Sequence, residues 1–179
     1  MTQKVLFLDF DGVINTDRMA IDALTKEGEW RDEFGLRFDP ESILNLRHII
    51  EETQARIVAI TSWKQYGLDY LQEIWQGRQM PGEISDITPD YRTDFEMDAH
   101  HQPKCVQVPL MSKGEGIEEW ILQEQLQGRE TQYAILDDIQ SFTLDQQPHF
   151  IQICAHCGIT SKDADRAIQI LSQNIRQHE

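Results

Sequence analysis

Short apolar runs and amphipathic stretches alternate along the chain. The apolar runs are rich in β-branched and aromatic side chains, which predicts strands that are covered on both faces. Such strands are typical of parallel sheets packed between helices. The predicted strands cover Lys4–Asp9, Arg56–Thr61, Ile84–Ile87, Gln132–Leu136 and Phe150–Cys154.

Between these runs, apolar side chains recur at the spacing of a helix face. Asp39-Pro40 is typical of an N-cap followed by proline at the first helical position, and Thr160–Asp163 is typical of a capping box. Further helices are expected over Tyr66–Gln76 and over Glu115–Gln127, the latter ending near Gly128. Strands that alternate with helices predict an α/β fold with a central, mostly parallel sheet.

Two polar stretches do not fit this alternation. Asp17–Arg37 is broken by Gly28 and Gly35, and Asp90–Pro109 is polar, with His100, His101, Pro103 and Lys104. Long connections of this kind in a compact domain are usually lids, binding loops or disordered segments. We therefore predict one domain over residues 1–179, with small insertions at about 17–37 and 90–109 that lie above the sheet.

The charge balance narrows the classes of function. The chain has 179 residues, with 31 acidic and 16 basic side chains, and a formal net charge of −15. Broad nucleic-acid binding depends on Lys and Arg contacts to phosphates, so this balance argues against it but leaves a local basic pocket open. The pattern shows neither an apolar run of about 20 residues nor a signal peptide, so we expect a cytoplasmic protein without membrane contact.

The strongest candidate for chemistry follows the first predicted strand. Asp9 and Asp11 are one residue apart, and Gly12 then allows a sharp turn. Side chains at i and i+2 of a strand share a face, so both carboxylates could point at one site. Their repulsion would require a cation, and a few carboxylates together with a substrate phosphate suit Mg²⁺.

The run Asp9-Phe10-Asp11-Gly12-Val13 resembles the first motif of the haloacid dehalogenase superfamily, most of whose members are phosphatases. The second motif, a hydroxyl residue that closes a strand, corresponds to Thr61, with Ser62 as the alternative register. The third corresponds to Lys113 near a helix start, and the fourth to the pair Asp137-Asp138. The resemblance implies a Rossmann-type three-layer fold with small cap insertions.

A narrower group of short haloacid dehalogenase domains, found alone or inside RNA-repair proteins, is also similar. The segments that carry this resemblance are Thr61–Lys64, Ile117–Trp120 and His149–Ile170.

The superfamily resemblance implies a role for each matched residue. Asp9 would be the nucleophile that forms an aspartyl-phosphate, and Asp11 would act as general acid and then general base. Thr61 and Lys113 would hold the phosphoryl oxygens. The implied phosphate or substrate contacts are Gly12, Thr61, Ser62 and Lys113. The implied Mg²⁺ ligands come from Asp9, Asp11 through its backbone carbonyl, Asp137 and Asp138, and analogy with motifs that carry Gly before one Asp favours Asp138.

Structural alternatives stand beside these roles. The paired aspartates could mark strand-end turns, the hydroxyls of Thr61 and Ser62 could cap a helix, and Lys113 could be a surface lysine.

Two further residue types are open to more than one interpretation. Cys154-Ala155-His156-Cys157 could be a redox pair or half of a zinc site with Cys105, His100, His101 or His156, but we expect buried or half-buried cysteines without such a role. The tryptophans are expected to be packing anchors, with Trp63 as the exception because it follows the predicted phosphate-binding strand end.

The sequence therefore predicts a Mg²⁺-dependent phosphomonoester hydrolase whose substrate is a phosphorylated small molecule rather than nucleic acid. One alternative is a polynucleotide end-phosphatase, which would need a basic groove. Others are a phosphotransferase and a non-catalytic module that binds phosphate or Mg²⁺. The residues that would form the basic groove are Lys64, Arg78, Arg92, Lys104 and Lys113.

Overall fold

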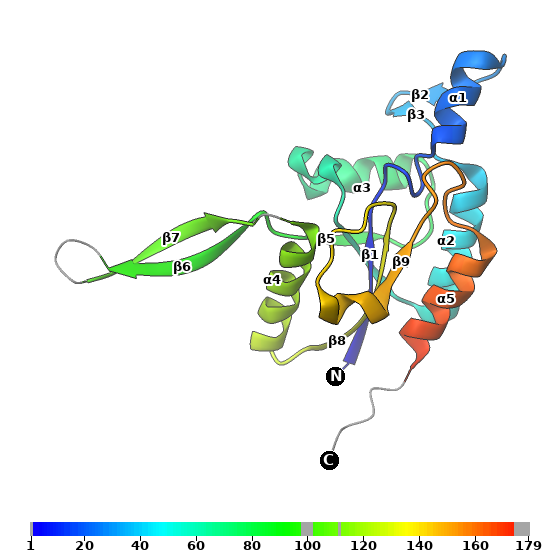
Figure 1. Cartoon of the computed structure of the whole chain (residues 1–179). Helices are drawn as coiled ribbons and strands as arrows, with labels where there is room; N and C mark the ends of the chain where they lie inside the picture. The colour runs from blue at the N-terminus through cyan, green and yellow to red at the C-terminus, as the bar shows by residue number, and fades with distance from the viewer. Residues whose placement is uncertain (1, 98–101, 111, 174–179) are drawn as a thin grey trace.

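A parallel sheet forms the centre of the molecule. The computed structural model describes residues 2–97, 102–110 and 112–173. Within these residues, five parallel strands are arranged in the order β5-β4-β1-β8-β9 (Figure 1). The α/β fold with a parallel sheet is therefore confirmed. The strands are β1 (Thr2–Leu8), β4 (Arg56–Ala59), β5 (Ile84–Ile87), β8 (Glu130–Asp137) and β9 (Phe150–Gln152).

The register of the sheet aligns the ends of its central strands. Leu8 of β1 pairs with Ala59 of β4 on one side and with Leu136 of β8 on the other. One step further, the Asp9 amide donates to the Leu136 carbonyl at 3.0 Å, and the Ile60 amide donates to the Leu8 carbonyl at 3.0 Å. Residues that follow β1, β4 and β8 therefore emerge together at the carboxyl edge of the sheet, where α/β proteins bind ligands.

Helices cover both faces of the sheet and produce three layers. On β1, Leu6 and Leu8 belong to the core shared with α2 (Pro40–Thr53), α3 (Leu68–Gly77) and α5 (Ser161–Ser172). Val5 and Phe7 face the opposite way, toward Ile117 and Trp120 of α4 (Lys113–Leu126). This alternation explains why the first predicted strand is apolar at successive positions.

Two predicted helix starts are confirmed, and a third helix begins two residues later than predicted. The N-cap at Asp39 and the capping box from Thr160 to Asp163 are confirmed. The helix predicted over Tyr66–Gln76 begins later, because a short 3₁₀ helix, η1 (Ser62–Tyr66), ends at Gly67 before α3 starts. Gly67 has a φ of +91°, a conformation that other residues adopt only under strain.

The first insertion contains more regular structure than its sequence indicated. It forms α1 (Asp17–Thr25) and a small hairpin of β2 (Arg31–Asp32) and β3 (Gly35–Leu36) (Figure 1). Thr16 caps α1, but Ile21 and Leu24 are 50% and 86% exposed. Met19 is the one buried residue of this helix, so the helix adds little to the core.

The second insertion is an antiparallel arm that projects from the sheet (Figure 1). Its strands are β6 (Tyr91–Met97) and β7 (Pro103–Pro109), and the Leu110 amide donates to the Asp90 carbonyl at 2.8 Å where the arm begins. The arm was expected only as a polar stretch, but its first strand carries an alternation, with Tyr91, Phe95 and Met97 between Arg92, Asp94 and Glu96, that indicates a strand. His100 and His101 lie outside the described residues.

Candidate functional site

Three carboxylates meet at the carboxyl edge of the sheet. One oxygen each of Asp9, Asp137 and Asp138 lies within 4.8 Å of the others, close enough to hold one metal ion. Asp9 is 4% exposed and Asp137 is fully buried. Hard carboxylate oxygens in this number fit Mg²⁺.

Lys113 supplies a positive charge to this cluster. Its Nζ donates to Asp9 Oδ2 at 2.8 Å and to Asp137 Oδ2 at 2.6 Å. The lysine is the first residue of α4, whose N-cap Ser112 forms a capping box with Glu115. The helix start thus fixes the position from which Lys113 reaches the two carboxylates.

The crowding of charge changes the pKa values of the cluster. Burial, followed by the charge of Asp137, raises the pKa of Asp9 to about 6, although Lys113 opposes the rise. Burial also raises the pKa of Asp137, against the hydrogen bonds from Lys113 and the Ile139 amide. Burial lowers the pKa of Lys113, but the two carboxylates outweigh it and the net pKa is raised. A further cation would relieve the remaining repulsion, which supports the fit to Mg²⁺.

Asp11 is exposed and is held by two side chains. Asn15 Nδ2 donates to Asp11 Oδ1 at 2.7 Å, and Trp63 Nε1 donates to Asp11 Oδ2 at 2.9 Å. The turn behind it is tight, because the amides of Val13, Ile14 and Asn15 all donate to the Phe10 carbonyl. These contacts therefore orient the Asp11 carboxylate, which is not part of the cluster formed by Asp9, Asp137 and Asp138.

Gly12 allows the close approach between this turn and Asp138. Its φ is +77°, and a Cβ atom built on it would lie 2.5 Å from Asp138 Cγ and 2.9 Å from Asp138 Cβ. The glycine is therefore required both by the backbone conformation and by the space that the Asp138 side chain occupies.

Thr61 and Ser62 occupy different environments. Thr61 is fully buried at the end of β4 and caps η1, where its Oγ1 accepts from the Trp63 amide at 3.3 Å. Thr61 therefore caps a helix, which was the structural alternative to a role in phosphate binding. Ser62 is exposed and lines a cavity of about 350 Å³ with Tyr66 and Tyr70.

The predicted basic groove is largely neutralised by acidic neighbours. Four of its five members pair with carboxylates, and Lys104 lies exposed on β7. The pairs are Lys64–Asp90 at 2.7 Å, Arg78–Asp32 at 2.8 Å, Arg92–Asp94 at 3.9 Å, and Lys113 with Asp9 and Asp137.

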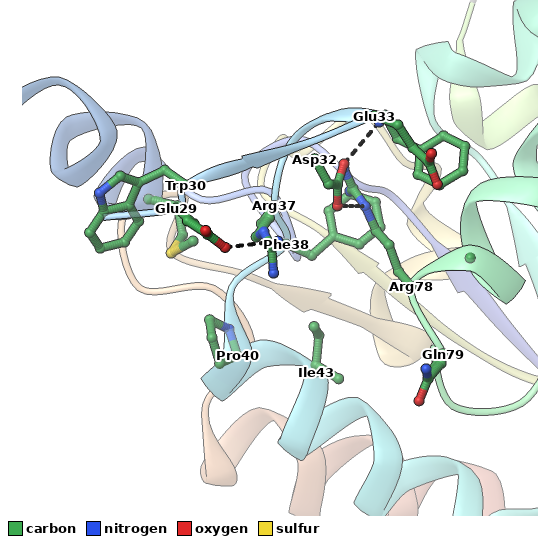
Figure 2. Close-up of a pocket in the computed structure, with 13 residues that line it drawn as sticks. Glu29, Trp30, Asp32, Glu33, Arg37, Phe38, Pro40, Ile43, Arg78 and Gln79 are labelled. Carbon is green, nitrogen blue, oxygen red and sulfur yellow. Dashed lines mark hydrogen bonds and ion pairs between the residues drawn. The ribbon is translucent and has the colours of Figure 1, made fainter. Parts of the chain in front are cut away.

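A second hollow of about 590 Å³ lies beneath the first insertion (Figure 2). The Asp32–Arg78 ion pair borders it, and the Arg78 guanidinium lies 4.2 Å from the centroid of the Phe38 ring. Phe38 in turn packs against Trp63, the residue that donates to Asp11, so aromatic contacts connect this cavity to the site. Its aromatic walls are Trp30, Phe34 and Phe38.

The expectation of buried cysteines is wrong. Cys105, Cys154 and Cys157 are all exposed, the first on β7 and the other two in the turn after β9. As expected, Trp75 and Trp120 are buried in the core, whereas Trp63 contacts the site.

One site contact had no signal in the sequence. The contact of Asn15 with Asp11 depends on the turn that folds the chain back, and an amide four residues after Asp11 has no distinguishing pattern in the sequence.

The sheet topology, the carboxylate cluster at its carboxyl edge and the lysine from α4 define a haloacid dehalogenase-like domain with a Rossmann-like sheet. More narrowly, the chain belongs to the family described as the HAD domain in Swiss Army Knife RNA repair proteins, whose model matches residues 5–164. At the superfamily level this membership supports a phosphatase-like hydrolase. No curated protein and no solved structure matches the chain. None of the described helices is long and apolar enough to span a membrane.

Proposed function

We propose that the protein is a Mg²⁺-dependent phosphomonoester hydrolase that acts through an aspartyl-phosphate on Asp9. The observation that carries the proposal is the bridge from Lys113 Nζ to Asp9 and Asp137 within the three-carboxylate cluster. A nucleophilic carboxylate, a fixed positive charge and oxygen ligands for a metal are the groups that phosphoryl transfer requires.

In the first step, an Asp9 carboxylate oxygen forms a bond to phosphorus as the bond to the leaving oxygen breaks. With its pKa at about 6, Asp9 is ionised at neutral pH and is able to attack. Asp11 donates a proton to the leaving oxygen, and its exposed position suits contact with a substrate that arrives from solvent.

In the second step, Asp11 accepts a proton from water as the water oxygen attacks the phosphorus of the aspartyl-phosphate. The bond between phosphorus and Asp9 breaks, which releases phosphate and regenerates the carboxylate. The hydrogen bonds from Asn15 and Trp63 orient Asp11 for both transfers. Lys113 and, from the end of β4, Thr61 are the groups we assign to the phosphoryl oxygens.

Asp9, Asp138 and the Asp11 carbonyl are the ligands that we assign to Mg²⁺. When bound, the metal would neutralise the carboxylates and the phosphoryl oxygens. Asp137 has a different role, because both of its oxygens already accept hydrogen bonds, from Lys113 and from the Ile139 amide. It positions Lys113 rather than substrate.

A phosphorylated small molecule is the substrate class that the charge distribution favours. The basic side chains around the site are paired with carboxylates, so they offer little attraction to a polyanion. One observation favours a second candidate, a phosphorylated polynucleotide end, namely the description of the family by its RNA-repair proteins.

The test is phosphate release from a panel of sugar phosphates, nucleotides and 3′- or 5′-phosphorylated oligonucleotides, with Mg²⁺ and with EDTA. We expect Mg²⁺-dependent turnover that Asp9→Asn abolishes and that Asp165→Asn, on the exposed surface of α5, retains. Acid-quenched wild-type protein should carry one phosphoryl group on Asp9.

Turnover that survives Asp9→Asn, or that is unaffected by EDTA, would contradict the mechanism. A preference for oligonucleotides that falls steeply with salt would instead select the polynucleotide substrate.

A further inference from the structure

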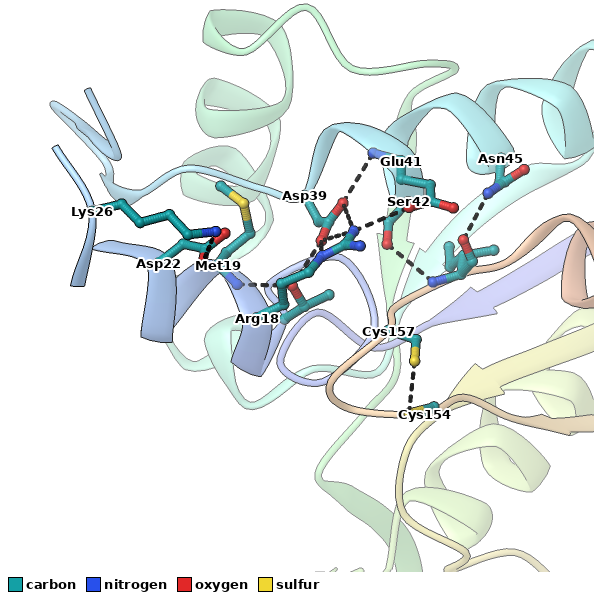
Figure 3. A network of polar contacts seen from close by, with 12 residues as sticks. Arg18, Met19, Asp22, Lys26, Asp39, Glu41, Ser42, Asn45, Cys154 and Cys157 are labelled. Carbon is teal, nitrogen blue, oxygen red and sulfur yellow. Dashed lines mark hydrogen bonds and ion pairs between the residues drawn. The ribbon is translucent and has the colours of Figure 1, made fainter. Parts of the chain in front are cut away.

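The turn that follows β9 holds two cysteines side by side. Cys154 Sγ and Cys157 Sγ are 3.2 Å apart, and both residues are exposed (Figure 3). The amides of Cys157 and Gly158 both donate to the Cys154 carbonyl, at 2.9 and 2.8 Å, and fix the tight reversal. The two sulfurs are therefore adjacent and accessible to small reagents.

Contacts with two other segments, the start of α1 and the N-terminal half of α2, hold this turn in place. The Asp17 amide at the start of α1 donates to the Ala155 carbonyl at 3.0 Å. On the other side, the Ile159 amide donates to Ser42 Oγ at 3.0 Å, and Asn45 Nδ2 donates to the Ile159 carbonyl at 2.8 Å (Figure 3). A protein disulfide requires sulfurs about 2 Å apart, so these would need to approach by only about 1 Å, with the turn already formed.

Gly158 brings the turn into close contact with its neighbours. Its φ is +70°, and a Cβ atom there would lie 2.0 Å from Ser42 Oγ and 2.7 Å from Thr16 Cγ2. The turn is thus wedged between the N-terminal part of α2 and the residues that precede α1. It is a fixed part of the fold rather than a loose loop.

The two thiols differ in reactivity. The hydrogen bond that the sulfurs share, together with the amides of Cys157 and His156, lowers the pKa of Cys154. The same hydrogen bond, followed by burial and the charge of Cys154, raises the pKa of Cys157, and Arg18 opposes the rise. The thiolate is the reactive form, so Cys154 is the better attacking group of the pair.

A metal site is the alternative for a pair of this spacing. Structural zinc sites use four protein ligands. Among residues 2–97, 102–110 and 112–173, the acidic cluster of Asp9, Asp137 and Asp138 is the one group of three or more candidate ligands. The cysteine pair has no third ligand within that part of the chain, so two-electron oxidation is the chemistry that its geometry supports.

We propose that Cys154 and Cys157 are a redox-active dithiol, which a low-molecular-weight disulfide such as oxidised glutathione converts to an intramolecular disulfide. The Cys154 thiolate attacks one glutathione sulfur, and the first glutathione thiolate leaves. Cys157 then loses its proton and attacks Cys154 Sγ, which expels the second glutathione. The protein dithiol is oxidised by two electrons, and one oxidised glutathione becomes two reduced molecules.

The experiment uses the full chain with Cys105→Ser, which leaves the pair as its only thiols. The protein is equilibrated in buffers of graded reduced and oxidised glutathione, then treated with an alkylating agent and weighed intact by mass spectrometry. We expect a transition from two alkyl groups to none, with the loss of two hydrogens and little glutathione adduct.

Single variants in the same background test the order of the steps. Cys157→Ser should accumulate a glutathione adduct on Cys154, because the second attack is missing. Cys154→Ser should form no intramolecular disulfide and should carry at most one glutathione adduct, on Cys157. Both positions are exposed, so thermal unfolding of the two variants should match that of the parent.

Three results would overturn the proposal. The first is a parent protein that remains doubly alkylated in fully oxidising buffer. The second is a parent that accumulates stable glutathione adducts in place of the disulfide. The third is stoichiometric Zn²⁺ on the protein as purified, lost in Cys154→Ser, which would assign the pair to a metal instead.

Discussion

Replacing Gly12 by alanine tests the contact between the turn after β1 and Asp138. The added Cβ atom would lie 2.5 Å from Asp138 Cγ and 2.6 Å from Oδ2. Rotation of the Asp138 side chain would move these two atoms but not its Cβ atom, which would remain 2.9 Å away. The backbone must therefore shift, either at the turn or at the end of β8.

The expected loss of stability in Gly12→Ala is the sum of a conformational cost and a packing cost. Placing alanine at a φ of +77° costs about 1–2 kcal/mol, because the left-handed region is unfavourable for residues with a Cβ atom. Insertion of a methyl group into a filled space costs about 1–3 kcal/mol more. We expect Gly12→Ala to lower the free energy of unfolding by about 2–5 kcal/mol, and the displaced Asp138 to weaken Mg²⁺ binding.

Gly128→Ala is the matched control. Gly128 has a φ of +75°, but no atom lies within 4 Å of a Cβ atom built there. This variant should lose only the conformational part, about 1–2 kcal/mol, and bind Mg²⁺ as the wild type does. Urea unfolding and calorimetric titration with Mg²⁺ measure both quantities. Equal losses of stability in the two variants, with equal Mg²⁺ affinities, would refute the contact.

Three further predictions concern individual polar contacts. Lys113→Met leaves two buried carboxylates without their bridging cation, so urea unfolding in EDTA at pH 7 should show a loss of about 3–5 kcal/mol, reduced when Mg²⁺ is added. Trp63→Phe keeps the aromatic packing but removes the donor to Asp11; if the proposed hydrolase is correct, kcat should fall while the melting temperature changes little. The third contact is the ion pair of Asp32 with Arg78. Partial burial favours the protonated carboxyl, but this ion pair outweighs it and lowers the pKa of Asp32. Asp32→Asn should therefore cost about 1–3 kcal/mol at neutral pH, and the difference should disappear as the pH falls from 3.8 through the lowered native value. A pH-independent difference would exclude the ion pair as its source.

The elements that the sequence predicts well are those that bury an apolar face. β1 and β4 are covered on both sides, so their apolar runs are continuous, and α2 combines an N-cap with buried Leu46 and Ile49. The helix and strands of the two insertions were not predicted. α1 buries only Met19, and the described side chains of the β6–β7 arm are mostly exposed, so neither insertion contributes a wide apolar face to the core. The alternation of Tyr91, Phe95 and Met97 with charged residues was nevertheless a signal for a strand.

In the candidate site, the residues could be identified from the sequence, but the contacts between them could not. Asp9 and Asp11 could be selected from their position after a buried strand, whereas Thr61, Lys113 and Asp137-Asp138 were selected by their resemblance to the later motifs of the superfamily. The hydrogen bonds between these residues could not be predicted, because the distance from Lys113 to Asp9 depends on how α4 packs beside the sheet. The hydrogen bonds to Asp11 likewise depend on a turn and on η1, which are separate in sequence and meet only in the folded chain.

The hydrogen bond at the base of the β6–β7 arm has an evolutionary consequence. Because Leu110 meets Asp90 there, the chain leaves and rejoins the core at nearly one point. The arm is an exchangeable module, since its length or sequence can change by mutation or recombination while the ends that join it to the domain stay in register. Thr88, which precedes it, is buried beside Gly116 of α4, the helix that carries Lys113. A change in the length or sequence of the arm can therefore leave the residues at the sheet edge in place.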